Sequence, residues 1–266
     1  MLQSPCFVFS DTHLGVAPLA VEQSAIAFLR SLHGRAGSLV INGDLFDFWF
    51  EWRRVIPRHG FRVLAALADL RESGVPIIWL AGNHDGWGGN VLREDVGVDY
   101  HPGPWEGDLA GWSARVEHGD GLRPKGDRPY RALRRVIRHP LSIRLFRLLH
   151  PDLGTRLAMG SSSASRAYTT AEAHGKKISE LRGIARQYLE QHPELELLIY
   201  GHSHDPALER APSGGVYANA GSWLDAPTYL VVTPGRVELC RWTGSAEGER
   251  LHSLDRRAEL PQEALP

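Results

Sequence analysis

Acidic, amide and imidazole side chains follow five short apolar runs of this chain. Donors of this mixed kind suit Mn²⁺, Fe or Zn²⁺ better than an all-oxygen Mg²⁺ or Ca²⁺ site. Two such ions that share a bridging carboxylate form a clamp for in-line displacement at phosphorus. The pattern therefore predicts a metal centre that hydrolyses a phosphoester. The five motifs are Asp11-Thr12-His13, Gly43-Asp44-Leu45-Phe46-Asp47, Gly82-Asn83-His84-Asp85, His118-Gly119-Asp120 and Gly201-His202-Ser203-His204.

Each motif alone has an ordinary structural explanation. An Asp-x-His segment can cap a helix, and a His-x-His pair can lie exposed in a loop. Their joint occurrence after apolar runs, each with a glycine nearby that permits close backbone approach, favours one shared site. The candidate metal ligands are Asp11, His13, Asp44, Asn83, His118, His202 and His204.

The elements that must position these side chains alternate in the first part of the chain. Apolar residues recur at helical spacing between short apolar runs, which predicts a parallel sheet with right-handed crossovers. Open sheets of this kind bind ligands at their carboxyl edge, where the motifs fall. The predicted strands are 7–9, 39–41 and 77–80, and the predicted helices are 20–32 and 61–73.

The second half of the chain has a different pattern. A strand at 112–117, a long helix at 168–191 and a strand at 195–200 are followed by short runs separated by turn signals. These short runs, at 207–210, 216–219, 229–232 and 237–242, predict an antiparallel second sheet. One domain is expected over residues 1–246, with a polar tail over 247–266.

Residues 123–166 form a basic insert. Eleven Lys and Arg against two Asp give this segment a charge of +9, so the rest of a chain of net charge -1 carries -10. Apolar spacing predicts two short helices broken at Pro140, with a flexible joint at Gly160–Ser165. The insert is expected either to hold substrate and contact anionic lipid, or to be a packed hairpin with a solvated basic face. Nucleic acid is disfavoured, because no aromatic residues are interleaved with the arginines.

The cellular setting follows from features that are missing. Cys6 and Cys240 lie far apart without metal or redox spacing, as expected in a reducing compartment. The first residues lack the pattern of a signal peptide, and no apolar run approaches the roughly 20 residues that span a bilayer. The sequence predicts a cytoplasmic protein whose membrane contact, if it has one, is peripheral.

The order and spacing of the five motifs resemble the calcineurin-like metallophosphoesterase superfamily over about residues 7–239. The resemblance implies an α/β fold, a four-layer sandwich of two mixed β-sheets flanked by helices, here with a helical insertion. It also implies two divalent ions, with Mn²⁺ preferred and Fe or Zn²⁺ as alternatives, and attack on phosphorus by metal-bound hydroxide. One ion would take Asp11, His13, Asp44 and His204, and the other Asp44, Asn83, His118 and His202.

The same resemblance gives His84 and Asp85 catalytic roles. His84 would stabilise the phosphate and protonate the leaving oxygen, and Asp85 would orient its ring. An imidazole with a pKa near 6.5 suits proton donation close to neutral pH. The alternatives are that His84 is an additional metal ligand or a bystander.

Within the superfamily, the chain is similar to the UDP-2,3-diacylglucosamine pyrophosphatases of lipid A biosynthesis. The similarity is carried by Gly43–Trp49, by His118-Gly119-Asp120 before a basic helical insert, and by Gly201–His204 after a long helix. It implies release of UMP and 2,3-diacylglucosamine 1-phosphate at the inner face of the cytoplasmic membrane, with acyl chains held by the insert.

The chain departs from that group at two places. His84 stands where many members have Arg, and Arg123-Pro124-Lys125-Gly126 replaces an acidic pair. The substrate is therefore open: another nucleotide, another lipid or a small phosphoester is the alternative, and a non-catalytic binding scaffold of the same fold is a second. No protein partner can be inferred. By analogy Tyr130, Lys176 and Lys177 would contact substrate, unless they are ordinary surface residues.

Overall fold

Two mixed β-sheets form the centre of the molecule in the computed structural model, which describes residues 1–167 and 171–256. In the seven-stranded sheet β1 to β4 are parallel and β10 to β12 are antiparallel to their neighbours, and in the five-stranded sheet β6, β7 and β9 are parallel. The seven-stranded order is β12 (Glu249–Asp255), β11 (Arg236–Arg241), β10 (Thr228–Thr233), β1 (Cys6–Phe9), β2 (Ser38–Asn42), β3 (Ile77–Leu80), β4 (Asp99–His101). The five-stranded order is β5 (Trp105–Leu109), β6 (Trp112–Val116), β7 (Leu197–Tyr200), β9 (Val216–Asn219), β8 (Ala207–Arg210).

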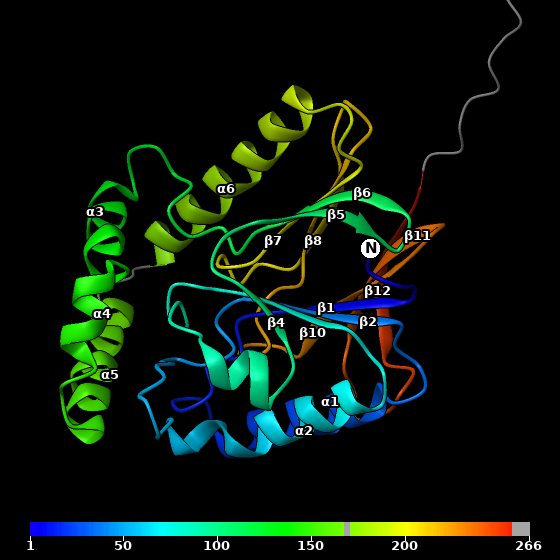
Figure 1. Ribbon diagram of the computed structural model, residues 1–266. Helices are drawn as coiled ribbons and strands as arrows, with labels where there is room; N and C mark the ends of the chain where they lie inside the picture. The colour runs from blue at the N-terminus through cyan, green and yellow to red at the C-terminus, as the bar shows by residue number, and fades with distance from the viewer. Residues whose placement is uncertain (168–170, 257–266) are drawn as a thin grey trace, which may run out of the picture.

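Helices cover the outer face of each sheet, so the molecule has four layers (Figure 1). Alternate residues of a strand point to opposite faces: Phe7 and Phe9 of β1 pack on Phe28 of α1 (Leu19–Ser31), whereas Val8 packs with residues of the five-stranded sheet. α2 (Phe61–Glu72) lies beside α1, and α6 (Ala171–Gln191) packs through Ala185 and Leu189 on the other sheet. This arrangement confirms the predicted four-layer α/β sandwich.

The insert forms three helices at one end of the two sheets (Figure 1). α3 (Arg128–Ile137) and α4 (Pro140–Phe146) are separated at the predicted break, because Pro140 tolerates only the first turn of a helix. The predicted joint at Gly160–Ser165 is wrong, since α5 (Pro151–Ala167) continues through it. Serine and alanine do not break a helix, and a single glycine costs only about 1 kcal/mol there. Residues 168–170 of the predicted helix 168–191 lie outside the described residues.

The predicted antiparallel second sheet is wrong in its pairing. β8 and β9 belong to the five-stranded sheet, where β9 pairs in parallel with β7. β10 and β11 belong to the other sheet, where β10 pairs with β1. Turn signals define where strands begin and end, but the choice of a distant partner depends on packing that no local pattern records. Two short strands, β4 and β5, were not predicted at all.

The predicted tail also contains structure. β12 pairs with β11 and closes one edge of the seven-stranded sheet, so the domain reaches Asp255 instead of ending at 246. Its side chains are almost all exposed, which is common for an edge strand and leaves no alternation of apolar and polar residues to detect. Residues 257–266 of that tail lie outside the described residues. Within the described ranges, none of the helices has the length and apolar character needed to cross a bilayer.

Candidate metal centre

The predicted ligands lie in loops that follow five parallel strands. Asp11 follows β1, Asp44 follows β2 and Asn83 follows β3, whereas His118 follows β6 and the His202–His204 segment follows β7. The carboxyl ends of these parallel strands, from both sheets, therefore lie close together. The side chains of Asp11 and Asp44 are almost completely buried there, and His118 is nearly so.

Five of these residues adopt a left-handed backbone that side chains other than glycine rarely take. Their φ angles are 53° at Asp11, 49° at His13, 52° at Asp44, 61° at His202 and 58° at His204. Each such residue costs about 1–3 kcal/mol, and residues of this kind cluster at functional sites. The fold holds these five in an unfavourable conformation, in which their side chains converge.

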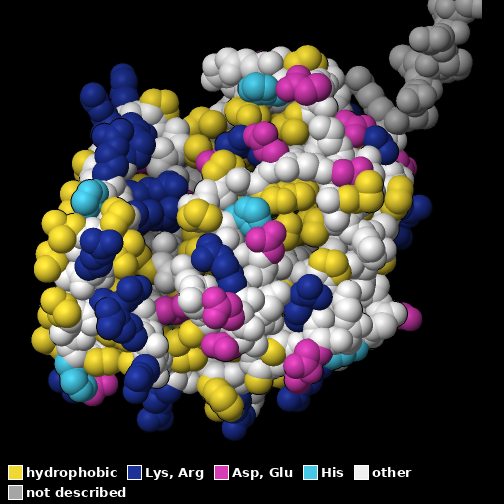
Figure 2. All heavy atoms as spheres, in the orientation of Figure 1, with side chains coloured by type: hydrophobic (Ala, Val, Ile, Leu, Met, Phe, Trp, Pro, Cys, Tyr) yellow, Lys and Arg dark blue, Asp and Glu magenta, His cyan; other side chains and the backbone are white. Residues whose placement is uncertain are grey.

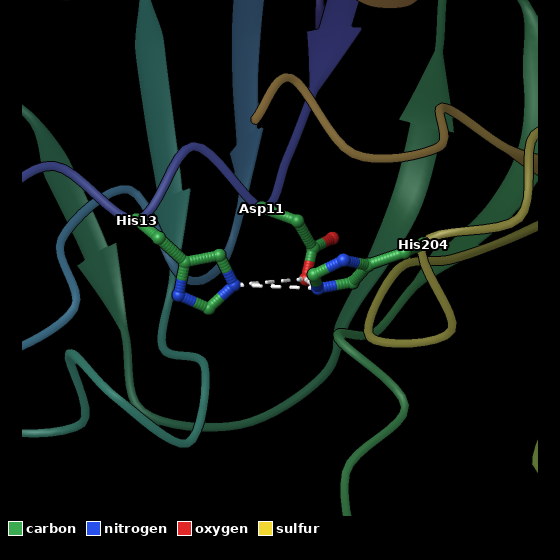
Figure 3. A group of neighbouring side chains, drawn as sticks. All are labelled: Asp11, His13 and His204. Carbon is green, nitrogen blue, oxygen red and sulfur yellow. Dashed lines mark hydrogen bonds and ion pairs between the residues drawn. The ribbon is translucent and has the colours of Figure 1, made fainter. Parts of the chain in front are cut away.

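One group of converging side chains is Asp11, His13 and His204. The Nε2 atoms of His13 and His204 lie 3.3 Å apart, and Asp11 Oδ1 lies 3.3 Å from His204 Nε2 and 4.0 Å from His13 Nε2. Figure 3 shows the two rings pointing toward one another beside the Asp11 carboxylate. Two imidazole nitrogens and one carboxylate oxygen are thus positioned to bind one cation.

A second group consists of Asp44, His118 and His202. His118 Nε2 lies 3.2 Å from Asp44 Oδ2, which is also 4.0 Å from His13 Nε2 in the first group. Asp44 therefore lies between the two groups, as a bridging ligand would. A third overlapping group joins His13, Asp44 and His84, so the geometry keeps His84 within reach of an ion.

Several buried atoms at this centre that could bind a metal ion lack a hydrogen bond to any described residue. Asp11 Oδ1, Asn83 Oδ1 and His118 Nε2 are buried and accept or donate no hydrogen bond within the described residues. Buried polar atoms normally have a partner, and each exception needs an explanation such as an ion. Carboxylate, amide and imidazole atoms in this state fit a divalent cation of the Mn²⁺, Fe or Zn²⁺ kind.

Close approach between the loops requires glycine. A Cβ atom at Gly43, whose φ is 82°, would collide with the His118 ring, and one at Gly82 would collide with the Asp44 carboxylate. The glycines of the motifs thus let the loops after β2, β3 and β6 come together around the centre.

Outer hydrogen bonds fix which ring nitrogen faces the centre. His118 Nδ1 donates to Asn42 O at 2.8 Å, and His204 Nδ1 donates to Asp225 Oδ2 at 2.8 Å. His13 Nδ1 lies 3.4 Å from Asp47 Oδ1. Such partners orient metal-binding imidazoles and leave Nε2 for the ion. Asp225 was not predicted, because a single carboxylate in the loop after β9 has no motif around it.

Replacing Asp225 with Ala should weaken metal binding without unfolding the protein, since this side chain is 61% exposed. Loss of an outer partner of this kind costs about 10- to 100-fold in metal affinity or activity. Titration of the apoprotein with Mn²⁺ would measure the change. The matched control is Glu194→Ala, which removes a carboxylate 3.1 Å from His192 in another imidazole pair outside the centre. Equal Mn²⁺ affinity in both variants would contradict the assigned role.

The charges at the centre also favour a cation. Burial acts to raise the pKa of Asp44, but His118 and His84 outweigh it and hold the pKa well below its usual range. Burial acts to lower the pKa of His118, yet Asp44 and Asp11 raise it to about 10. The buried carboxylates therefore strongly prefer positive charge beside them, and metal binding replaces protons at such ligands.

The predicted role of Asp85 is corrected by its contacts. Its carboxylate accepts hydrogen bonds from the Gly82 and Leu45 N–H groups, both at 2.8 Å, and from Trp79 Nε1 at 3.2 Å. Burial, together with the Asp44 carboxylate, raises the pKa of Asp85 to about 6. Asp85 thus fixes the loops rather than the His84 ring.

Asp47 contacts the His84 ring, as does His13, whose ring centroid lies 4.9 Å from that of His84. His84 Nδ1 donates to Asp47 O at 3.0 Å and lies 3.6 Å from Asp47 Oδ1. The backbone N–H of His84 donates to Asp44 Oδ1 at 2.9 Å, so the His84 backbone is bonded to the Asp44 carboxylate. Asp47 was part of a recognised motif, but its role depends on a contact with a loop 37 residues away.

The three predicted substrate residues lie in different surroundings. Lys177 Nζ donates to His202 O beside the centre, and burial lowers its pKa, whereas Lys176 is exposed. Tyr130 donates to Asp120 Oδ2, which also accepts from Arg134 at 3.0 Å. Lys177 and Tyr130 therefore lie against the loops that carry His202 and His118, respectively.

A two-sheet sandwich with this donor set at its shared edge defines a metal-dependent hydrolase of phosphoesters. The sequence model described as Calcineurin-like phosphoesterase matches residues 5–206, and the chain belongs to this family. A UDP-2,3-diacylglucosamine hydrolase of Porphyromonas gingivalis is 31% identical over 76% of this chain and 84% of its own. A UDP-2,3-diacylglucosamine hydrolase of Pectobacterium carotovorum subsp. carotovorum is 29% identical over 86% of this chain and 95% of its own.

Solved structures show the same fold at low identity. GAP50, described as the anchor in the inner membrane complex of Plasmodium, matches with a TM-score of 0.50 and 12% identity over 98% of this chain and 91% of its own. The family and its hydrolases make this chain an enzyme that uses divalent metal ions, and they do not support the alternative of a non-catalytic scaffold.

Proposed function

We propose that the enzyme hydrolyses UDP-2,3-diacylglucosamine to 2,3-diacylglucosamine 1-phosphate and UMP. The observation that carries this proposal is an apolar cavity of about 360 Å³ between the insert and the loops beside the metal centre. The two relatives named for this substrate support it. The cavity is lined by Phe48, Phe50, Trp87, Leu133, Ile137, Ser142, Ile143, Phe146, Leu157 and Ala158.

The cavity is placed to receive an acyl chain from a substrate at the centre. Phe48 directly follows Asp47, which contacts the His84 ring, and Trp87 lies three residues after His84. The insert contributes the facing wall through Ile143 and Phe146 of α4, and the Phe146 ring lies 4.8 Å from that of Phe50. Pockets of this size, mostly apolar with polar groups at one end, suit a ligand with a hydrocarbon part and a charged part.

In this proposal the centre would hold two divalent ions, and Asp44 would be a ligand of both. Asp11, His13 and His204 complete one ligand set, and Asn83, His118 and His202 complete the other. The ions would activate the attacking water and neutralise charge on the phosphate oxygens. Mn²⁺ is the preferred ion, with Fe or Zn²⁺ as the alternatives that this donor set also suits.

His84 is assigned the proton transfer. Its Nδ1 donates to Asp47 O, so Nε2 is the ring nitrogen that we assign to the substrate oxygens. Water loses one proton to solvent as it adds to phosphorus, and the bond from phosphorus to the leaving oxygen breaks. His84, protonated on both ring nitrogens, gives that oxygen the Nε2 proton and recovers a proton from solvent. Lys177 adds a positive charge at the loop of His202. The alternative for His84, as an additional ligand, predicts that His84→Gln lowers Mn²⁺ affinity as well as kcat.

The outer surface of the insert suits peripheral contact with an anionic membrane. Figure 2 shows basic side chains gathered over α3–α5 with hydrophobic ones along the outer edge. Leu148 is 82% exposed, Val136 61% and Leu145 58%, among arginines such as Arg144 and Arg147. Co-sedimentation with vesicles that contain anionic lipid tests the contact. Binding should weaken at high salt, as screening requires, and absence of binding at low salt would refute it.

The decisive test is hydrolysis of UDP-2,3-diacylglucosamine by the Mn²⁺-loaded enzyme, measured beside bis-p-nitrophenyl phosphate. Release of UMP from the lipid with a higher kcat/KM than for the aryl diester is expected. Cleavage of the aryl diester alone would refute the lipid substrate and favour another nucleotide or a small phosphoester. His84 and the segment Arg123–Gly126 are the sequence features that would then explain the different substrate.

A further inference from the structure

One arginine of the insert is hydrogen-bonded to the loop that carries Asn83 and His84. Arg138, the residue after α3, donates from Nη2 to Gly82 O at 2.8 Å and from Nη1 to Pro102 O at 3.0 Å. Gly82 is buried at the end of β3, and Pro102 follows β4. A single guanidinium thus joins the ends of two neighbouring strands from outside the sandwich.

The Gly82 carbonyl belongs to the peptide unit that begins Asn83. Because that unit is planar, fixing the carbonyl also fixes the direction in which the Asn83 backbone starts. Other hydrogen bonds of this loop come from the body, where Asp44 accepts from the His84 N–H and Tyr100 donates to Asp85 O. Within the described residues, Arg138 is the hydrogen-bond donor to Gly82 O.

A second contact joins the same two parts of the molecule. Trp87 Nε1 donates to Ile137 O at 3.1 Å. Trp87 lies three residues after His84, and Ile137 directly precedes Arg138. Gly86 makes room for the guanidinium, since a Cβ atom there would lie 2.7 Å from Arg138 Nη2. The end of α3 therefore contacts the loop at both of its ends, at Gly82 and at Trp87.

We propose that Arg138 is a positioning residue through which the insert holds Asn83 and His84 in place at the metal centre. The insert would then serve the reaction itself as well as binding the lipid. This inference rests on the proposed roles of Asn83 and His84 but not on the lipid substrate. Its effect must therefore be visible with a small substrate that does not touch the cavity.

The test compares Arg138→Met, Arg138→Lys and Arg135→Met with bis-p-nitrophenyl phosphate as substrate. Methionine keeps an unbranched flexible stem but loses the guanidinium and both bonds, whereas lysine can reach one of the two carbonyls. Arg135, on α3, is exposed, and its side chain makes no hydrogen bond or ion pair within the described ranges, so it controls for the loss of charge. Misplacement of a reacting group by about 1 Å costs about 100-fold, so a kcat lower by about 10- to 100-fold is expected for Arg138→Met, with KM nearly unchanged.

Mn²⁺ affinity, measured by titration calorimetry of the apoproteins, provides a readout that does not depend on turnover. It should fall about tenfold in Arg138→Met, as for other residues that orient a ligand. Arg138→Lys should lie between wild type and Arg138→Met in both measurements, and it decides the question if Arg138→Met does not fold. Gly86→Ala should act in the same direction, because its methyl group displaces the guanidinium.

Two results would overturn the proposal. Wild-type kcat and Mn²⁺ affinity in Arg138→Lys and Arg138→Met would show that the bonds to Gly82 and Pro102 hold only the insert. A raised KM at unchanged kcat would show that Arg138 binds the substrate phosphate instead. Failure of the wild-type enzyme on UDP-2,3-diacylglucosamine would remove the lipid substrate but leave these aryl diester results, and hence this inference, intact.

Discussion

Replacing Asp44 with Asn should reduce hydrolysis of every phosphoester by about 1000-fold or more. Asp44 lies in two of the three converging groups, so its loss affects both proposed ions at once. A metal ion at such a site contributes several kcal/mol of charge stabilisation, and about 4 kcal/mol corresponds to about 1000-fold in rate. Asparagine keeps the volume and an oxygen that can accept from the His84 N–H. The measurements are kcat/KM for bis-p-nitrophenyl phosphate and bound metal by elemental analysis.

Asp69→Asn is the matched control, because Asp69 is an exposed carboxylate on α2 away from the centre. It should bind metal and turn over substrate like the wild type. Near-native far-UV circular dichroism of Asp44→Asn would show that the loss comes from the centre and not from unfolding. If Asp44→Asn instead retained two equivalents of metal and more than a tenth of the activity, Asp44 could not be the bridging ligand.

The sequence points to the candidate ligands because each lies in a short motif with a glycine nearby. Asp44 could be placed from Leu39–Ile41 alone, since an apolar run followed by Asn42-Gly43 is typical of a buried strand that ends in a tight loop. The sequence does not reveal that five of the candidate ligands have left-handed φ angles. That property belongs to the folded loops, in which each motif is held by contacts from the others.

Residues that act on the ligands from outside are harder to find. Asp225 bonds to His204 across 21 residues, Asp47 to His84 across 37, and Arg138 to Gly82 across 56. None of the three has a spacing that marks its role, because each role depends on two loops that meet only in the folded chain. The assignment of Asp85 to the His84 ring was wrong for this reason, since adjacency in sequence does not imply contact.

The pairing of the later strands could not be predicted for a related reason. The runs at 216–219 and 229–232 look alike in composition, yet β9 pairs with β7 and β10 pairs with β1 in different sheets. Each is buried on both faces, so neither has an alternation that would reveal its neighbours. β12 was not predicted for the opposite reason, since its side chains are almost all exposed and resemble those of a polar tail.

Filling the apolar cavity should separate the lipid substrate from small ones. Ser142 of α4 is half-buried and lines the cavity, so a Trp side chain at this position would occupy the space proposed for an acyl chain. Exposing about five methylene groups costs about 4 kcal/mol, or about 1000-fold in kcat/KM. Ser142→Trp should therefore lose about this much activity on UDP-2,3-diacylglucosamine. It should cleave bis-p-nitrophenyl phosphate within about twofold of wild type, because the metal centre is untouched.

Leu148→Trp supplies the control for an added tryptophan on the insert, since Leu148 is 82% exposed and does not line the cavity. Ser142→Ala removes the hydroxyl group without adding volume, and both controls should turn over the lipid like the wild type. A parallel loss on both substrates in Ser142→Trp would mean that the substitution disturbs the loop of Asn83 and His84 through Trp87 and Arg138. Retention of lipid turnover would show that the acyl chains lie elsewhere, because a filled cavity cannot bind them.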